Sequence, residues 1–181
     1  LKGMDSVYHI CPNMAPDELE IGKRMLKLAQ KANISHFVYH SVMHPQIQEV
    51  QHHWNKLLVE EQVFKSGIPF TIIQPAAYMQ NLLGYWKTIF NDGVYRVPYS
   101  PEAKFTNVDL EDLAEAVTLI LQNPARFSNG IYELVGPDTL SSAEMIEIVS
   151  SILGREVRIE LEDLILWEKS MRARNSSDYA I

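Results

Sequence analysis

The sequence predicts an α/β protein built around a parallel β-sheet. Short apolar, β-prone segments alternate with amphipathic helical segments along the first ninety or so residues. Strands joined through a helix run parallel, and successive crossovers place helices on both faces of the sheet. The composition, 46% hydrophobic and 22% charged, is enough for one core and a small appended lobe.

Three strand–helix pairs make up the first half of the chain. Apolar runs closed by a proline or a polar loop predict strands, and helical spacing of apolar residues predicts helices. In the first helix, for example, Asp17, Glu18 and Glu20 crowd the first turn, where acids favour the helix dipole. We expect strands over residues 6–11, 36–42 and 70–74, and helices over residues 16–32, 50–65 and 78–90.

The second half has shorter elements. Ser141 and Glu144 fit a capping box, which predicts a helix from there to about Gly154. A further helix opens at Asp109, with Asp109 and Asp112 as capping acids. We expect strands over residues 94–97, 104–108, 130–135 and 157–161, and helices over residues 109–122 and 141–154.

Charge and composition disfavour several classes of function. The formal net charge is -7 and there is no run of lysines and arginines, which argues against direct nucleic-acid binding. Cys11 is the only cysteine, so no intrachain disulfide can form, as is usual in a reducing cytoplasm. No stretch approaches the roughly 20 apolar residues that span a bilayer, and no signal peptide is visible. We therefore expect a cytoplasmic protein without membrane attachment.

Polar residues gather at the predicted carboxyl edge of the sheet, where open parallel sheets bind ligands. Ser41 ends the second strand, and the segment Gln74–Asn81 follows the third. His52 and Lys56 lie four residues apart, on one face of the helix between these strands.

The ordered set of these residues resembles the NmrA-like branch of the short-chain dehydrogenase/reductases. Ordinary members carry a serine after a strand and a Tyr-x-x-x-Lys pair on the next helix. Here Ser41 is followed by His52 and Lys56, so the lysine matches and a histidine replaces the tyrosine. The segments 38–41, 66–75, 108–114 and 130–136 follow the family's pattern as well, and the resemblance covers about residues 5–157.

The resemblance implies a doubly wound, Rossmann-type parallel sheet with a small α/β C-terminal substrate lobe. It implies a nicotinamide cofactor, with NADP slightly favoured over NAD. Lys56 would bind the nicotinamide ribose, and His52 with Ser41 would be the catalytic pair. The other residues that would line the cofactor are Cys11, Pro12, Ser41, Pro75, Ala76, Tyr78 and Asn81.

The family's glycine-rich phosphate turn is absent from the sequence, as is the strand that separates NAD from NADP. We therefore expect the chain to be a fragment that lacks the N-terminal βαβ units and breaks off at its end. Residues 1–91 would be the later part of the dinucleotide-binding domain. Residues 92–181 would combine its final elements, about 105–136, with the substrate lobe.

Each candidate residue also has a structural interpretation. Ser41 could cap a turn, Lys56 could be a solvated lysine paired with Glu60, and His52 could be non-catalytic. Cys11 could be a small buried residue. The histidines at positions 40, 44, 52 and 53 do not predict a metal site, because no carboxylate or cysteine spacing supports one.

Two functions follow from these residues and the resemblance. The first is an NAD(P)H-dependent reductase of small molecules such as quinones, with a proton from His52 or water. The alternative is a non-catalytic redox sensor that binds the cofactor and regulates a partner protein, which the missing tyrosine favours. A role on nucleotide sugars is weakened by the same loss. The partner is thus a small substrate or a regulated protein, and the chain a monomer or homodimer.

Overall fold

The computed structural model describes residues 1–173, which form two compact units. The first unit contains residues 1–76 and 111–134. The second contains residues 77–110 and the described residues from 135 onward. The expected break in structure over residues 176–181 lies outside the described residues.

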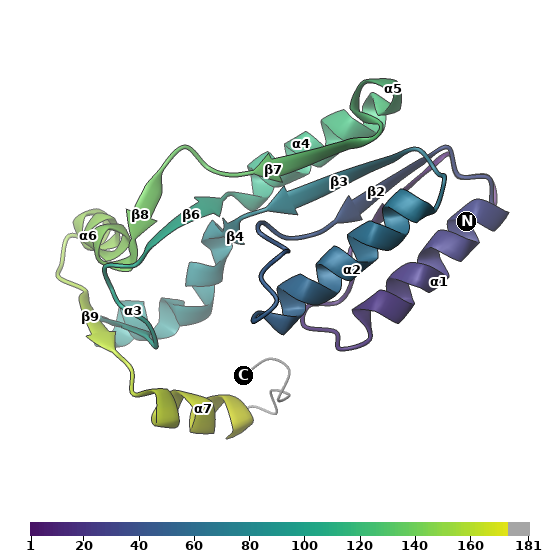
Figure 1. Cartoon of the computed structure of the whole chain (residues 1–181). Helices are drawn as coiled ribbons and strands as arrows, with labels where there is room; N and C mark the ends of the chain where they lie inside the picture. Colours follow the sequence, from purple (N-terminus) through teal and green to yellow (C-terminus); the bar gives the residue numbers. More distant parts are fainter. Residues whose placement is uncertain (174–181) are drawn as a thin grey trace. The chain divides into compact units, whose positions relative to one another are not determined.

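A four-stranded parallel sheet forms the centre of the first unit (Figure 1). All its neighbouring strands pair in parallel, which confirms the predicted fold class. Each strand lies within one or two residues of its expected position. In spatial order the strands are β1 (Ser6–His9), β2 (His36–His40), β3 (Phe70–Pro75) and β7 (Gly130–Leu134).

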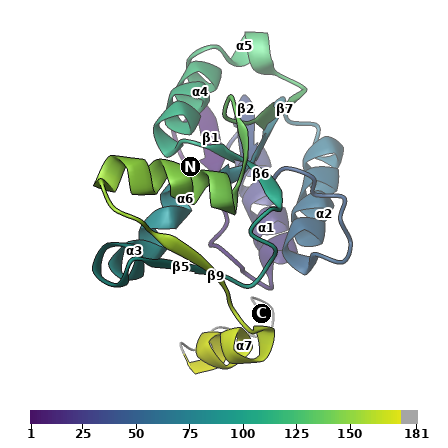
Figure 2. The same cartoon turned by 90° about the vertical axis from the view of Figure 1, so that its left-hand side faces the viewer.

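Helices cover both faces of this sheet, as a doubly wound fold requires (Figures 1 and 2). The helices α1 (Glu18–Lys31) and α2 (Gln51–Lys65) lie side by side on one face. The helix α4 (Leu110–Gln122) lies on the other, followed by the short α5 (Pro124–Phe127).

The core between the sheet and the two N-terminal helices consists of large apolar side chains. Alternate residues of the central strands point to this face, because strand side chains alternate with a period of two. Gly22 lets the helices approach closely, since a Cβ there would lie 2.7 Å from a methyl of Val59. The main contributors are Leu26, Ala29, Phe37, Tyr39, Val59, Val63, Phe70 and Ile72.

The second unit is built from short strands and helices. One sheet joins β4 (Ala77–Tyr78), β6 (Lys104–Val108) and β8 (Thr139–Ser141), and a second joins β5 (Val94–Val97) and β9 (Arg158–Leu161). Its helices are η1 (Met79–Tyr85), α3 (Trp86–Asp92), α6 (Ser142–Leu153) and α7 (Leu164–Ala173).

The capping box that opens α6 is confirmed. The Ser141 hydroxyl accepts from the Glu144 amide at 3.1 Å, and the Glu144 carboxylate accepts from the Ser141 amide at 2.7 Å. The single helix expected over residues 78–90 is wrong. Tyr78 is extended because it pairs with Val108, a tight 3₁₀ segment with Gly84 in it follows, and α-helix begins only at Trp86.

Across residues 1–173, no helix combines the length and apolar character that crossing a bilayer requires.

Candidate functional site

The carboxyl ends of the central strands define the candidate site in the first unit. β1 ends at His9, β2 at His40 and β3 at Pro75. The chain after β2 stays hydrogen-bonded to its neighbour, because the Ser41 amide donates to the Ile73 carbonyl at 2.8 Å. This places Ser41 at the sheet edge where parallel sheets bind ligands.

The loops that follow β1 and β2 each hold a residue in an unusual backbone conformation. Met14 has a φ of 53° and His44 a φ of 54°, in the left-handed region that residues with a Cβ seldom adopt. Such residues cost free energy and are concentrated at functional sites. Asn33 and Asn129, which precede β2 and β7, share this conformation, so it does not by itself mark this edge as a binding site.

Lys56 of α2 is buried at this edge, with its side chain 7% exposed. Its ammonium donates to the Glu18 carboxylate at 2.7 Å and to the His40 carbonyl at 3.3 Å. It also lies 5.7 Å from the centre of the Tyr39 ring. The interpretation of Lys56 as a solvated lysine paired with Glu60 is therefore wrong, because a buried acid on α1 is its partner.

His52 lies one turn before Lys56 and faces the same acid. Its Nδ1 atom is 3.8 Å from Oε2 of Glu18, and the imidazole is 13% exposed. Burial lowers the pKa of His52, the nearby Lys56 ammonium lowers it further, and Glu18 opposes both. The ring is therefore neutral at pH 7, where it can accept a hydrogen bond more readily than it can give up a proton.

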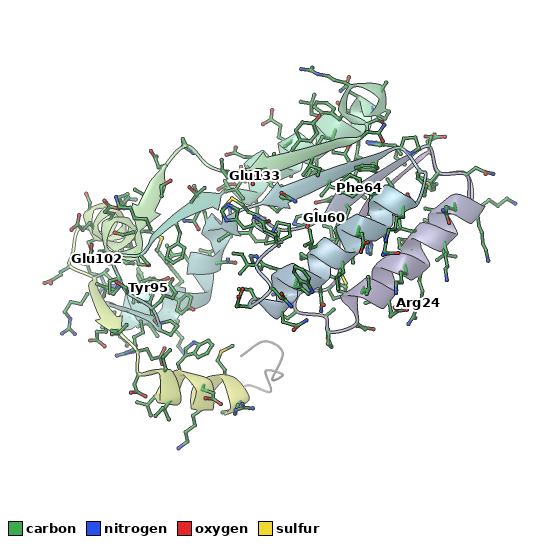
Figure 3. All side chains as sticks on the ribbon, in the orientation of Figure 1. Arg24, Glu60, Phe64, Tyr95, Glu102 and Glu133 are labelled. Carbon is green, nitrogen blue, oxygen red and sulfur yellow. The ribbon has the colours of Figure 1, made fainter. Side chains whose placement is uncertain are left out.

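Ser41 does not cap a turn with its side chain. Its hydroxyl donates to Oε1 of Glu60, a buried acid on the side of α2 that faces the sheet (Figure 3). The Gln74 amide donates to both oxygens of the same carboxylate, at 2.9 and 3.1 Å. Burial raises the pKa of Glu60, although these two donors oppose the shift. The cluster fixes the ends of β2 and β3 to α2.

Two further histidines end strands at this edge. His40 contacts the Tyr8 hydroxyl through Nδ1 at 2.5 Å, and burial followed by the Lys56 charge lowers its pKa to about 4. Burial likewise lowers the pKa of His9, whose ring stacks on Tyr39 with centroids 5.9 Å apart. At neutral pH Lys56 is thus surrounded by uncharged imidazoles.

The remaining first-unit candidates lie just after β1 and at the end of β3. Cys11 is 5% exposed, and burial with the nearby Glu18 charge raises the pKa of its thiol to about 11. Pro12 is exposed in the same loop. Pro75 and Ala76 are buried, and the Ala76 amide donates to the Leu134 carbonyl at 2.9 Å.

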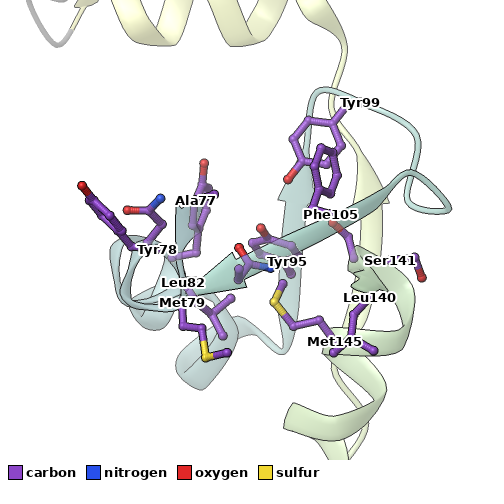
Figure 4. A pocket seen from close by; sticks show the side chains of 14 residues that line it. Ala77, Tyr78, Met79, Leu82, Tyr95, Tyr99, Phe105, Leu140, Ser141 and Met145 are labelled. Atoms are coloured by element: carbon purple, nitrogen blue, oxygen red, sulfur yellow. The ribbon is translucent and has the colours of Figure 1, made fainter. Parts of the chain in front are cut away.

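Tyr78 and Asn81 belong to the second unit, where both line a pocket of about 660 Å³ (Figure 4). Sites for small molecules are roughly 300–1,000 Å³, so this volume suits a small-molecule ligand. Burial raises the pKa of the Tyr78 phenol. The lining is largely apolar and aromatic: Ala77, Tyr78, Met79, Asn81, Leu82, Tyr85, Tyr95, Tyr99, Phe105, Asn107, Leu140, Ser141, Ser142 and Met145.

Aromatic pairs shape the walls of this pocket. Tyr85 meets Tyr95 edge to face with centroids 5.1 Å apart, and Tyr99 meets Phe105 in the same way at 5.2 Å. Such pairs hold flat surfaces in fixed orientations. The pocket therefore presents flat aromatic walls with few charged groups.

The first-unit edge fits the nicotinamide-ribose half of a dinucleotide by the chemistry of its donors. An ammonium has three N–H groups, and two acceptors are assigned to Lys56, which leaves one for a ribose hydroxyl. The surrounding neutral imidazoles suit a neutral sugar and carboxamide. Within residues 1–173, no cluster of three histidine, cysteine or acidic side chains is arranged to hold a metal ion.

Sequence reasoning missed the acids that organise this edge. The sequence predicted Glu18 only as an acid that favours the dipole of the first helix. It predicted Glu60 only as an exposed partner for Lys56. A signal existed for both, because Glu18 lies four residues before Gly22 on the buried face of α1, and Glu60 continues the buried face of α2 through Val59 and Val63. Charged residues on an apolar stripe are rarely buried without a specific partner.

Comparison with known proteins agrees with this architecture. A model of the NmrA-like family matches residues 1–166. The chain belongs to the NmrA-like family. This confirms the resemblance read from Ser41, His52, Lys56 and the segments around them.

Curated relatives of the chain include reductases and a regulator. An NAD(P)H azoreductase from Xenophilus azovorans is 32% identical over an alignment of 162 positions that covers 87% of this chain and 54% of that protein. The nitrogen metabolite repression protein nmr of Neurospora crassa is 28% identical over an alignment of 158 positions that covers 78% of this chain and 32% of that protein. The chain spans about half the length of the azoreductase and of other curated relatives that it matches.

Solved structures share the Rossmann-type fold. An NADPH-dependent quinone oxidoreductase from Escherichia coli, complexed with NADPH, has a TM-score of 0.85 and 16% identity, covering 98% of this chain and 62% of that one. A triphenylmethane reductase from Citrobacter sp., complexed with NADP(H), has a TM-score of 0.83 and 18% identity, covering 97% of this chain and 61% of that one.

Proposed function

We propose that the protein is an NAD(P)H-dependent reductase of planar, weakly polar acceptors such as quinones. The observation that carries this proposal is the buried Lys56 at the carboxyl edge of the parallel sheet, held by Glu18 and the His40 carbonyl. The names of the azoreductase and quinone oxidoreductase relatives support the cofactor and the reaction class. Similar folds with TM-scores of 0.85 and 0.83 hold NADPH or NADP(H), whereas others with TM-scores of 0.74 to 0.77 hold NAD, so we favour NADPH on the higher structural similarity.

The residues at the edge would bind and orient the cofactor. When bound, the reduced nicotinamide supplies a hydride. Lys56 would donate its remaining N–H to a hydroxyl of the nicotinamide ribose, and neutral His52 would accept from a hydroxyl. Ser41, Glu60 and Gln74 would fix the strand ends against which the ring lies. Cys11, Pro12, Pro75 and Ala76 would form the neighbouring wall.

The acceptor would occupy the aromatic pocket of the second unit, with Tyr78 and Asn81 as its polar wall residues. Flat faces such as Tyr95 and Phe105 match a planar ring in shape and polarity. Apolar burial supplies most of the binding free energy in such sites.

The family tyrosine, which serves as the proton donor, is missing here, and the lowered pKa of His52 makes this histidine a poor replacement because it is neutral at pH 7. An acceptor that needs no proton from the protein therefore suits the site. Hydride addition to a simple ketone produces a strongly basic alkoxide, which needs an acid at the moment of transfer. Addition to a quinone produces a phenolate, whose conjugate acid has a pKa near that of tyrosine, about 10. Solvent water can protonate this product afterwards, so quinone, NAD(P)H and one proton give hydroquinone and NAD(P)⁺.

An acceptor panel tests the proposal with the full-length protein. Loss of reduced-nicotinamide absorbance is measured with a benzoquinone, a naphthoquinone, an azo dye and a simple aliphatic ketone. We expect turnover with at least one planar acceptor and none with the ketone. Tight cofactor binding without turnover on any acceptor would refute the reductase and favour the sensor.

The redox sensor is the second candidate, and one observation favours it. The similar protein from Neurospora crassa is named for nitrogen metabolite repression rather than for a reaction. In that case Lys56 and His52 would serve cofactor binding alone. A sensor would bind NADPH and NADP⁺ with clearly different affinities and would turn over no acceptor, whereas equal affinities would leave it nothing to sense.

A further inference from the structure

A single acid connects the two side chains that the site depends on. Glu18 is the first residue of α1 and is completely buried. Its Oε1 atom accepts from the Lys56 ammonium at 2.7 Å and from the Tyr39 hydroxyl at 2.9 Å. An ammonium and a phenol on one oxygen fix the carboxylate in place.

The second oxygen of the same carboxylate faces His52. Oε2 of Glu18 and Nδ1 of His52 are both buried, both have no hydrogen-bond partner, and they lie 3.8 Å apart. A gap of that length is too short for an intervening water, and a small rotation of the imidazole closes it to hydrogen-bond distance. Two buried polar atoms that are otherwise unsatisfied have a strong reason to pair.

Pairing would determine which ring nitrogen of His52 carries the proton. A carboxylate can only accept, so Nδ1 must be the N–H and Nε2 the free lone pair. Carboxylates set the tautomer of metal-binding histidines in the same manner. The outer nitrogen of His52 then becomes a hydrogen-bond acceptor, one helical turn from the donor Lys56.

We propose that Glu18 is a positioning residue that makes Lys56 the donor and His52 the acceptor for a ligand hydroxyl pair at the sheet edge. This rests on the proposed function in one respect, because the hydroxyl pair is taken to be that of the nicotinamide ribose. Each hydroxyl of a vicinal diol both donates and accepts, so a fixed donor beside a fixed acceptor complements it.

Stability alone does not require a carboxylate here. A buried ion pair is often no more stabilising than apolar side chains of the same volume, because both charges must be desolvated. Glu20, in the same helical turn, forms an ordinary exposed pair with Lys23 at 2.8 Å. Glu20→Gln is therefore a matched control for Glu18→Gln, with the same chemical change in the same turn.

The first measurement uses the unaltered protein without cofactor. Nitrogen-15 NMR shifts of the imidazole report which ring nitrogen is protonated in neutral His52. The proposal predicts the Nδ1–H form, whereas imidazoles in water favour the Nε2–H form. Finding His52 in the Nε2–H form would overturn the proposal, and this test does not depend on any variant folding.

The second measurement compares the two variants. The charged and titratable groups that face His52 are Glu18 on α1 and Lys56 and His53 on its own helix. Glu18→Gln removes the attraction and leaves Lys56, so the pKa of His52 falls. NADPH binding weakens about tenfold or more, because both ligand contacts lose their support. Glu20→Gln leaves both values at those of the parent.

The outcomes separate this proposal from the proposed function. Unchanged titration of His52 and unchanged NADPH affinity in Glu18→Gln would overturn the positioning role, even in a protein that reduces quinones. Conversely, the tautomer and titration results stand without turnover on any acceptor, because both are measured without cofactor.

Discussion

The two units bury very different groups at their candidate sites. The sheet edge of the first unit buries polar and charged side chains, including Glu18, Lys56 and Glu60, each tied to named partners. The pocket of the second unit is lined mainly by aromatic and aliphatic side chains. Under the proposed function, the hydrogen-bonded edge would orient the cofactor and the apolar pocket would select the acceptor.

The largest effect should come from breaking the buried ion pair. Lys56→Met leaves the Glu18 carboxylate buried without its cation, which costs about 3–5 kcal/mol of stability. Urea unfolding measures this change, and NADPH titration of the folded protein should show at least tenfold weaker binding. Lys23→Met is the control, because Lys23 is 38% exposed in its pair with the exposed Glu20, and surface pairs contribute little to stability. Equal losses in the two variants would contradict the account.

Acid should destabilise the first unit through its buried histidines. The folded-state pKa of His40 is about 4, against about 6.5 when unfolded, so the unfolded chain binds more protons between these values. Stability is therefore complete above about pH 6.5 and falls as the pH drops to about 4, by about 3 kcal/mol for this residue. The lowered pKa values of His9 and His52 act in the same direction.

Glu60 opposes this trend, since its raised pKa favours the folded state at low pH and loses that contribution as the pH rises. Urea unfolding at several pH values measures the balance. His40→Gln should show a shallower decline between pH 7 and pH 5 than the parent. An identical slope in both proteins would show that His40 is not desolvated as described.

A substitution in the second-unit pocket should change the KM for the acceptor without changing the affinity for NADPH. Phe105→Ala removes an aromatic wall of the second-unit pocket, so the KM for a planar acceptor should rise about threefold to thirtyfold. The dissociation constant for NADPH should not change. Phe90→Ala is the control, because Phe90 is 55% exposed and does not line the pocket. A rise in the NADPH dissociation constant, with KM for the acceptor unchanged, would reverse the assignment of the two regions.

The smallest expected effects come from modifying or replacing Cys11. Its thiol is 5% exposed and has a pKa raised to about 11, so only roughly one molecule in ten thousand is a thiolate at pH 7. Alkylation by iodoacetamide should therefore be far slower in the folded protein than in urea. Cys11→Ser nearly keeps the size of this wall residue, so it should weaken NADPH binding far less than Lys56→Met does. Rapid labelling of the folded protein would show that this edge is more open than its burial implies.

Much of the first unit was predictable, because its signals are local. Short apolar runs that end at a proline or a polar loop predicted β1, β2 and β3. The helical spacing of apolar residues predicted α1 and α2. The second unit was harder. β8 exists because it pairs with β6 about thirty-five residues earlier, and β4 because Tyr78 pairs with Val108. Neither segment carries a pattern of its own that could reveal a pairing so distant in sequence.

The candidate site was predictable in its residues but not in its contacts. Ser41, His52 and Lys56 could be named from their order and spacing. That Lys56 bonds Glu18 rather than Glu60 depends on α1 packing beside α2, which Gly22 allows. The hydrogen bond from Ser41 to Glu60 depends on the packing of α2 against the sheet. The only sequence signal of such tertiary contacts is a charged residue on an otherwise apolar helix face.

The central claim is that this site binds and orients a reduced nicotinamide for an acceptor that needs no protein acid. The most direct test is the turnover of a quinone by His52→Phe at saturating NADPH. We expect weaker NADPH binding and a kcat within about threefold of the parent, because solvent supplies the proton. A general acid contributes roughly 10²–10⁴-fold. A kcat lower by a hundredfold or more, with NADPH affinity unchanged, would identify His52 as that acid and contradict the account.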